Sequence, residues 1–245
     1  MKKILSLMLL SVFLFSCSKE KEPMLMVNTT SVTLNAGDTH LITTTNGTNV
    51  SFKSANPYVA QVNETTGKIT AMTIGSTVIN ITSDQGNAQV LVLVTGKYFT
   101  YVEPCRDFSK TKSQILSMYG TPDSQTDTSL GYYHENDKAH FADLYIFENN
   151  KLTTSTAVIY QDYAVDAMYF LAERYWAAGS QDGMYMFVNG YSKDNITMAV
   201  TLTKVSGYKL YYVIYMPYSS STRYDINSNI ELDESLLSKF AEYKE

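Results

Sequence analysis

Short runs in which apolar and polar residues alternate occupy the chain from about residue 26 to residue 96. Runs such as Ser31–Leu34, Val50–Lys53 and Gln89–Val94 are separated by Asn, Gly and Pro residues, which favour turns. About seven short strands at this spacing, without a helical period, are typical of a two-sheet β-sandwich. The pattern therefore predicts an all-β sandwich over residues 26–96.

Beyond residue 97 the pattern changes, because apolar residues at helical spacing alternate with runs of period two. Helices are predicted at 110–119 and 164–177, with Ser109 and Asp162 as N-caps, and a third helix at 232–243. Strands are predicted at 98–102, 130–134, 141–147, 152–160, 184–188, 196–203 and 208–216. The prediction is an α+β domain over 97–245, in which a helix followed by an antiparallel three-strand meander occurs twice, at 109–160 and 162–217.

Several motifs of the first region occur together in one order. An Ala36-Gly37-Asp38 turn is followed by Phe52–Val62, by Thr66–Ala71 and by Ile74–Ile79. This series resembles the group 2 bacterial immunoglobulin-like domain, with Phe52 where that family usually has Trp. The resemblance implies an Ig-like sandwich that serves as a spacer or as part of an adhesin. We favour a spacer, because no cluster of acid, base and nucleophile occurs there.

The first helix–meander unit has its own resemblance. Thr111–Ile115, Tyr119–Pro122, Tyr132-Tyr133 and Tyr145–Leu152 are similar to the helix, Gly-x-Pro step and β-meander of the SmpA and β-lactamase-inhibitor-protein group. That similarity implies a non-enzymatic domain that binds another protein through its sheet face and loops.

The N-terminus has the pattern of a secretory signal. Lys2 and Lys3 precede the apolar run Ile4–Phe15, which is too short for a transmembrane helix. Leu14-Phe15-Ser16-Cys17 resembles a bacterial lipobox, which implies a signal peptide over 1–16, lipidation of Cys17 and a tether over 17–25. The polar, partly acidic segment after Cys17 resembles the surface-export signal of Bacteroidetes-type lipoproteins. We expect an outer-membrane lipid anchor, on the cell surface or the periplasmic face.

Composition narrows the class of protein further. The 245 residues are 44% hydrophobic and 18% charged, with a formal net charge of -5, so the chain has enough apolar residues for a packed core. The negative charge argues against a nucleic-acid partner, which requires a basic face. Two cysteines cannot form a disulfide framework.

Candidate catalytic and metal sites are weak in this sequence. Cys105 could act as a nucleophile with His134 or His140 as its base, but no activating motif surrounds it. The run from His134 to His140 also offers two carboxylates, yet its polar centre lies between two predicted strands and favours a solvated hairpin loop. The segment Asp225–Glu231 lacks the Gly and the Glu that a calcium loop requires. We therefore predict no catalytic residue, metal or cofactor.

Tyrosine is the remaining signal, because all but one of the 20 tyrosines follow residue 97. The tyrosines near the last predicted strand either fill the core or form an aromatic binding surface. They are Tyr208, Tyr211, Tyr212, Tyr215, Tyr218 and Tyr224. The function predicted is a membrane-anchored, non-enzymatic envelope lipoprotein that binds another protein through residues 97–245. Binding of a glycan by surface tyrosines is the alternative, and an unrecognised hydrolase is the least favoured.

Overall fold

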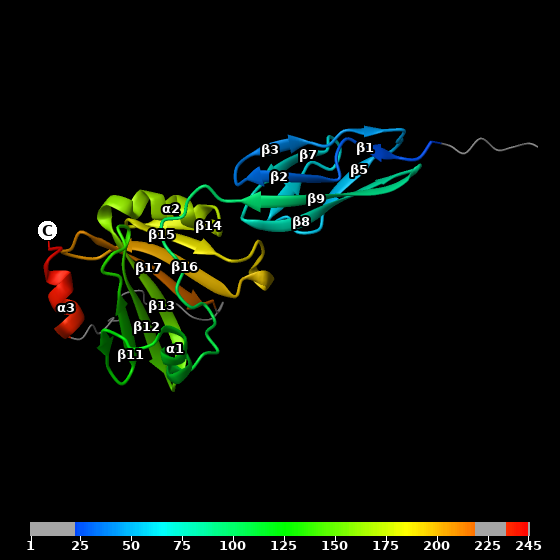
Figure 1. Ribbon diagram of the computed structural model, residues 1–245. Helices are drawn as coiled ribbons and strands as arrows, with labels where there is room; N and C mark the ends of the chain where they lie inside the picture. Colours follow the sequence, from blue (N-terminus) through cyan, green and yellow to red (C-terminus); the bar gives the residue numbers. More distant parts are fainter. Residues whose placement is uncertain (1–22, 219–233, 245) are drawn as a thin grey trace, which may run out of the picture.

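The computed structural model describes residues 23–218 and 234–244. Two β-rich domains lie end to end and are joined by the segment that follows strand β9 (Figure 1). These described residues form mainly β-structure with few helices. No helix in the described part is both long and apolar enough to cross a membrane.

The N-terminal domain is a β-sandwich. One sheet has the strand order β2-β9-β8-β5, a second has the order β3-β7-β6, and β1 pairs with β4. Strands β2 and β9 pair in parallel, whereas the other pairs are antiparallel. The bounds are β1 (Met26–Val27), β2 (Ser31–Asn35), β3 (Thr39–Leu41), β4 (Thr44–Thr45), β5 (Ser51–Ser54), β6 (Ala60–Val62), β7 (Lys68–Ala71), β8 (Gly75–Ser83) and β9 (Gly86–Thr95).

Alternate residues of these strands form the core between the two sheets. Phe52, Ile69, Ile79 and Val92 are buried in one cluster, as the period of two requires. Gly67 has a positive φ, and a Cβ there would meet the Phe52 ring and the Ile42 carbonyl oxygen at less than 3 Å, so this turn needs glycine. The seven strands predicted from the pattern are present as β2, β3 and β5–β9, and the two-residue strands β1 and β4 are additional.

The C-terminal domain is built on one eight-stranded antiparallel sheet. Its strand order is β10-β11-β12-β13-β17-β16-β15-β14, so the last strands of the two meanders, β13 and β17, pair at the centre. The bounds are β10 (Ser124–Gln125), β11 (Ser129–Tyr133), β12 (His140–Glu148), β13 (Lys151–Tyr160), β14 (Trp176–Gln181), β15 (Met184–Val188), β16 (Met198–Lys204) and β17 (Leu210–Pro217).

In the described part of the chain, three α-helices cover this sheet: α1 (Lys112–Tyr119), α2 (Ala164–Ala172) and α3 (Glu234–Ala241). Short 3₁₀ turns lie at Gln161–Tyr163 and Lys193–Asn195. On β12, Tyr145 packs with α1, whereas its neighbour Leu144 packs with α3. Because successive strand residues point to opposite faces, α1 and α2 lie on one face of the sheet and α3 on the other.

Several predictions for the C-terminal domain are wrong. Helices α1 and α2 are each followed by four antiparallel strands rather than three, because β10 and β14 were not predicted. The helix predicted at 164–177 ends at Ala172, and Trp176 starts strand β14 instead. The Glu173 carbonyl oxygen, which another helical turn would use, accepts a hydrogen bond from the Ile74 amide of the sandwich (2.7 Å). Residues 98–102 form no strand. Helix α1 also starts later than predicted, with Thr111 rather than Ser109 as the N-cap in a capping box with Gln114.

The junction between the domains centres on Glu173, whose side chain is buried. Its carboxylate accepts hydrogen bonds from the backbone amides of Lys97 (2.9 Å) and Tyr98 (3.1 Å). Tyr58 of the sandwich donates its hydroxyl to the Arg174 carbonyl oxygen (2.8 Å), and burial raises the pKa of Tyr58 to about 12. A Cβ on Gly96 would meet Glu173 Oε2 at 2.7 Å. The sandwich is therefore docked on α2 through directed polar contacts.

Candidate functional site

A cluster of two histidines and one aspartate lies at the start of β12, with His140 and Asp143 buried and His134 partly exposed. His140 and Asp143 belong to β12, and His134 follows β11 in the loop that joins the two strands. Asp137 shapes this loop, because its carboxylate accepts hydrogen bonds from the backbone amides of Ala139 and His140 (2.9 Å each). The predicted hairpin loop is present, and it positions one imidazole over the strand that follows.

A β-bulge brings His140 and Asp143 to the same face. Residues three apart on a regular strand point to opposite faces, but the pairing of β12 with β13 shifts between His140 and Ala142. Phe141 and Ala142 both pack in the cluster on the α3 side, which leaves His140 and Asp143 together on the α1 and α2 side. The extra residue of a bulge redirects a side chain in this way.

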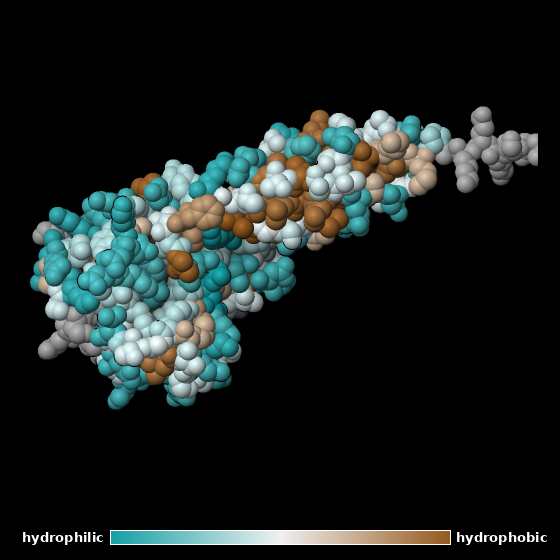
Figure 2. All heavy atoms as spheres, in the orientation of Figure 1, coloured by the Kyte–Doolittle hydropathy of each residue, from teal (hydrophilic) through white to brown (hydrophobic). Residues whose placement is uncertain are grey.

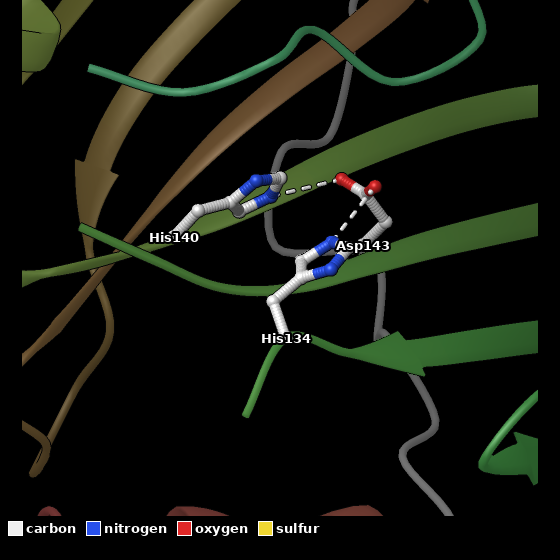
Figure 3. Close-up of side chains that lie close together, drawn as sticks. All are labelled: His134, His140 and Asp143. Atoms are coloured by element: carbon white, nitrogen blue, oxygen red, sulfur yellow. Dashed lines mark hydrogen bonds and ion pairs between the residues drawn. The ribbon is translucent and has the colours of Figure 1, made fainter. Parts of the chain in front are cut away.

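The two imidazole rings converge on the Asp143 carboxylate (Figure 3). His134 Nε2 lies 3.1 Å from Oδ2, and His140 Nε2 lies 3.0 Å from Oδ1. Burial disfavours the ionised carboxylate, but the two histidine hydrogen bonds outweigh burial and lower the pKa of Asp143. The hydrogen bond to Asp143 raises the pKa of His134 against the opposing effect of its partial burial. The Tyr101 ring packs edge-on against the His140 ring, with 5.6 Å between the ring centroids.

Sequence reasoning found both histidines of this cluster but missed Asp143. It grouped the histidines with the carboxylates of the loop, Glu135 and Asp137, because these lie between them in the chain. Asp137 instead bonds the loop backbone. No periodicity could have indicated Asp143, because the strand pattern places it on the opposite face from His140 unless the bulge is known.

The predicted tyrosine surface is partly wrong, because Tyr215 is a core residue. Its side chain is 0% exposed, and its hydroxyl lies 2.6 Å from that of Tyr101. Tyr211 packs against the same core cluster, while Tyr208 and Tyr212 pack near α3. These three and Tyr218 are half-buried, and Tyr224 lies outside the described residues. The strand tyrosines thus form no open aromatic row.

The other candidate residues are placed as follows. Cys105 is buried in an apolar cluster with Ile115 and Tyr145, and neither His134 nor His140 has a hydrogen bond to it among those found in the described part of the chain. A buried thiol in apolar surroundings is unreactive. Cys17 and the segment Asp225–Glu231 lie outside the described residues.

Large side chains are exposed at Phe99 on the connecting segment and at Val165 and Tyr169 on α2, around the half-buried Tyr98. We call Tyr98, Phe99, Val165 and Tyr169 the linker–helix patch. Phe99 is 78% exposed, the rings of Tyr98 and Tyr169 stack at 5.0 Å, and Val165 lies one helical turn from Tyr169 on α2. A cleft of about 460 Å³ between the domains opens beside Tyr98 and Tyr169 and is also lined by Met72, Lys97 and Glu173.

A second apolar area lies on the sandwich. Figure 2 shows hydrophobic residues gathered on this domain, over β9 and its neighbours. Leu91 and Leu93 of β9 are about half exposed there, and their outward neighbours on β2 are the polar residues Ser31 and Thr33. We call Leu91 and Leu93 the leucine stripe.

Comparison with known proteins defines the class of the N-terminal domain. Its two packed sheets make it an Ig-like sandwich. Residues 24–94 match the profile of the bacterial Ig-like domain (group 2), so the resemblance stated from the sequence motifs is confirmed for this domain. No curated protein matches the chain.

Solved structures show only distant likenesses. Domains 4–9 of the surface layer protein SbsC are 13% identical over 82% of this chain, with a TM-score of 0.27, and this chain covers 27% of that one. Domains 5–6 of the same protein are 14% identical, over 82% of this chain and 86% of that one, with a TM-score of 0.26. Domains EC1-2 of human protocadherin-24 are 10% identical, over 80% and 94%, with a TM-score of 0.25. Likenesses at this level carry no further conclusion.

Proposed function

We propose that this chain is a membrane-anchored, non-enzymatic lipoprotein of the cell envelope or cell surface that binds another protein through its C-terminal domain. The Ig-like domain serves as a spacer that holds the C-terminal domain away from the anchor. A lipid on Cys17 fixes the chain to the outer membrane, on its outer or periplasmic face. Ig-like domains carry no catalytic residues of their own, in keeping with a binding role.

The linker–helix patch is the observation that carries this proposal. Three of its four residues are aromatic, and aromatic residues are enriched at protein interfaces and among binding hot spots, whereas leucine is under-represented there. The patch lies beside the interdomain cleft, so a partner side chain has a recess to enter. The leucine stripe lacks aromatic residues, and its outward neighbours on β2, Ser31 and Thr33, are polar.

We further propose that the C-terminal domain is an α+β domain formed by duplication and related to the SmpA and β-lactamase-inhibitor-protein group. Each half consists of a helix followed by an antiparallel meander, α1 with β10–β13 and α2 with β14–β17. In support, the final strands of the two halves pair with each other. The halves differ in one respect, because the second lacks the Gly120-Thr121-Pro122 step after its helix.

Replacing both Phe99 and Val165 by serine is expected to weaken partner binding by about 10-fold or more, since removing a hot-spot side chain costs roughly 2 kcal/mol. The partner is first captured from envelope extract of the bacterium with the immobilised full-length chain. Its affinity for the two chains is then compared by biolayer interferometry. Both side chains are exposed, so the melting temperature should stay close to that of the unaltered chain.

The matched control replaces Leu91 and Leu93 by serine, which removes a similar exposed apolar area from the Ig-like domain. This variant should keep full affinity. Loss of binding in the leucine variant, with binding retained in the Phe99 and Val165 variant, would assign recognition to the Ig-like domain and refute the spacer role.

Cys17→Ala is expected to move the protein from the membrane fraction to the soluble fraction, because the acyl chains on Cys17 supply the anchor. Fractionation followed by mass measurement of the processed chain checks this. A variant that stays in the membrane fraction with an unchanged mass would contradict lipidation of Cys17.

A further inference from the structure

The carboxylate of Asp143 is a buried charge with few partners. Its side chain is 11% exposed, and the ion pairs found for it in the described part of the chain are those with His134 and His140. Neutral imidazoles donate hydrogen bonds to a carboxylate but do not compensate its charge. A buried carboxylate needs a positive charge nearby, which either a protonated histidine or a metal cation supplies.

We propose that His134, His140 and Asp143 form a zinc-binding site with a fourth coordination position open to water. Two imidazole nitrogens and one carboxylate oxygen are the ligand types that zinc takes when three protein ligands leave one position open. Imidazole nitrogens also discriminate against Mg²⁺ and Ca²⁺, which prefer oxygen ligands. This site is separate from the linker–helix patch and does not depend on the proposed function.

The distances between ligand atoms fit such a site with little movement. Every ligand atom of the cluster lies within 4.8 Å of the others, and the two nitrogen–oxygen distances are 3.0 and 3.1 Å. Ligand atoms around tetrahedral zinc are about 3.3 Å apart when the bonds are about 2.0 Å. The zinc ion takes the place of the protons that now join the imidazoles to the carboxylate. The distance between the two imidazole nitrogens shortens by movement of His134, because His134 lies in a loop whereas the other two ligands belong to a strand.

The nearby negative charges and the solvent access of this cluster favour the binding of a cation. The side chain of His134 is 34% exposed, so the cluster opens to solvent through the loop. Two further carboxylates lie near His134: Asp137 belongs to the same loop, and Asp123 accepts a hydrogen bond from the amide of Tyr133, the residue before His134. A negative potential at an accessible mouth raises the local concentration of cations.

The composition of the chain allows a clean test, because its only three histidines are His40, His134 and His140. The full-length chain is purified without a polyhistidine tag, stripped with a chelator and titrated with ZnCl₂ against a chromophoric competitor. One equivalent of Zn²⁺ should bind, and Mg²⁺ should not compete. Co²⁺ should give visible absorption bands typical of a low-coordinate site with nitrogen and oxygen ligands.

His134→Gln is the decisive variant, because His134 is partly exposed and its loss leaves the packed strand intact. Zn²⁺ affinity should fall by more than about 100-fold, since altering even residues that only orient metal ligands costs 10- to 100-fold. His40→Gln, which removes a histidine of the Ig-like domain, should leave affinity and stoichiometry unchanged. Thermal melting without metal checks that each variant is folded.

Three results would overturn the site: no stoichiometric Zn²⁺ binding by the unaltered chain, unchanged affinity in His134→Gln, or an equal loss in His40→Gln. If His134→Gln melts early without metal, Asp143→Asn takes its place, since the amide has nearly the shape of the carboxylate but lacks its charge. In that case, retention of the Co²⁺ bands by Asp143→Asn would exclude the carboxylate as a ligand.

Discussion

Tyr215→Ala is expected to destabilise the C-terminal domain by about 3–5 kcal/mol, the cost typical of truncating a buried aromatic residue. The Tyr215 ring is fully buried in the cluster between the sheet and α2. Its loss also leaves the Tyr101 hydroxyl without its partner at 2.6 Å. Urea unfolding followed by circular dichroism measures the free energy of unfolding.

The comparison variant is Tyr218→Ala, which alters a half-buried tyrosine just beyond β17. It should cost less than about 1 kcal/mol, as surface substitutions usually do. Similar costs for the two variants would show that Tyr215 is no more essential to the core than Tyr218.

The Tyr101–Tyr215 hydrogen bond can be separated from ring packing. Tyr215→Phe keeps the ring but leaves one buried hydroxyl unpaired, at a cost of about 1–3 kcal/mol. The double variant Tyr101→Phe, Tyr215→Phe removes both hydroxyls, so it should cost less than the two single changes added together.

Glu173→Ala is expected to cost about 1.5–3 kcal/mol and to loosen the junction between the domains. The substitution removes a buried carboxylate that accepts hydrogen bonds from the Lys97 and Tyr98 amides, and bonds to charged groups are the stronger kind. We expect faster proteolysis after Lys97 and a broader distribution of particle dimensions in small-angle X-ray scattering.

A control for this experiment is Asp38→Asn, which removes the exposed ion pair between Asp38 and Lys97 at 3.5 Å. An exposed pair contributes about 0–1 kcal/mol, so scattering and proteolysis should match the unaltered chain. If Glu173→Ala behaves like Asp38→Asn, the buried carboxylate does not hold the domains together.

The proposed spacer role depends on this junction. A freely hinged Ig-like domain would set only the distance of the C-terminal domain from its anchor. With Glu173, Tyr58 and Gly96 in place, the sandwich also fixes the orientation of α2. Because the linker–helix patch includes two residues of α2 and two of the connecting segment, the junction holds both parts of the patch in register.

The local alternation of apolar and polar residues was sufficient to predict most strands. The period of two in runs such as Gln89–Val94 and Leu152–Tyr160 predicted strands that the structure contains, as β9 and β13. The motifs around Phe52 and Ile74 were sufficient for the Ig-like domain. These features depend on neighbours a few residues apart in the chain, which is the range that periodicity and turn residues report.

Contacts between distant residues decided the rest. Helical spacing continues through Trp176, yet α2 stops at Ala172 because the next carbonyl oxygen is bound by Ile74, about 100 residues earlier in the chain. Periodicity likewise placed Tyr215 on one face of its strand, but only packing against Tyr101 and α2 showed that this face is closed.

The sequence by itself determined that the N-terminal domain is an Ig-like sandwich and that strands dominate the remainder. It also determined which residues share a face wherever a strand is regular. Tertiary structure alone decided what covers each face, where one extra residue bulges a strand, and therefore that Asp143 meets His134 and His140. The physical reason is that a strand pattern records burial by alternation, whereas a bulge and a docking partner arise from pairing with chain that lies far away in sequence.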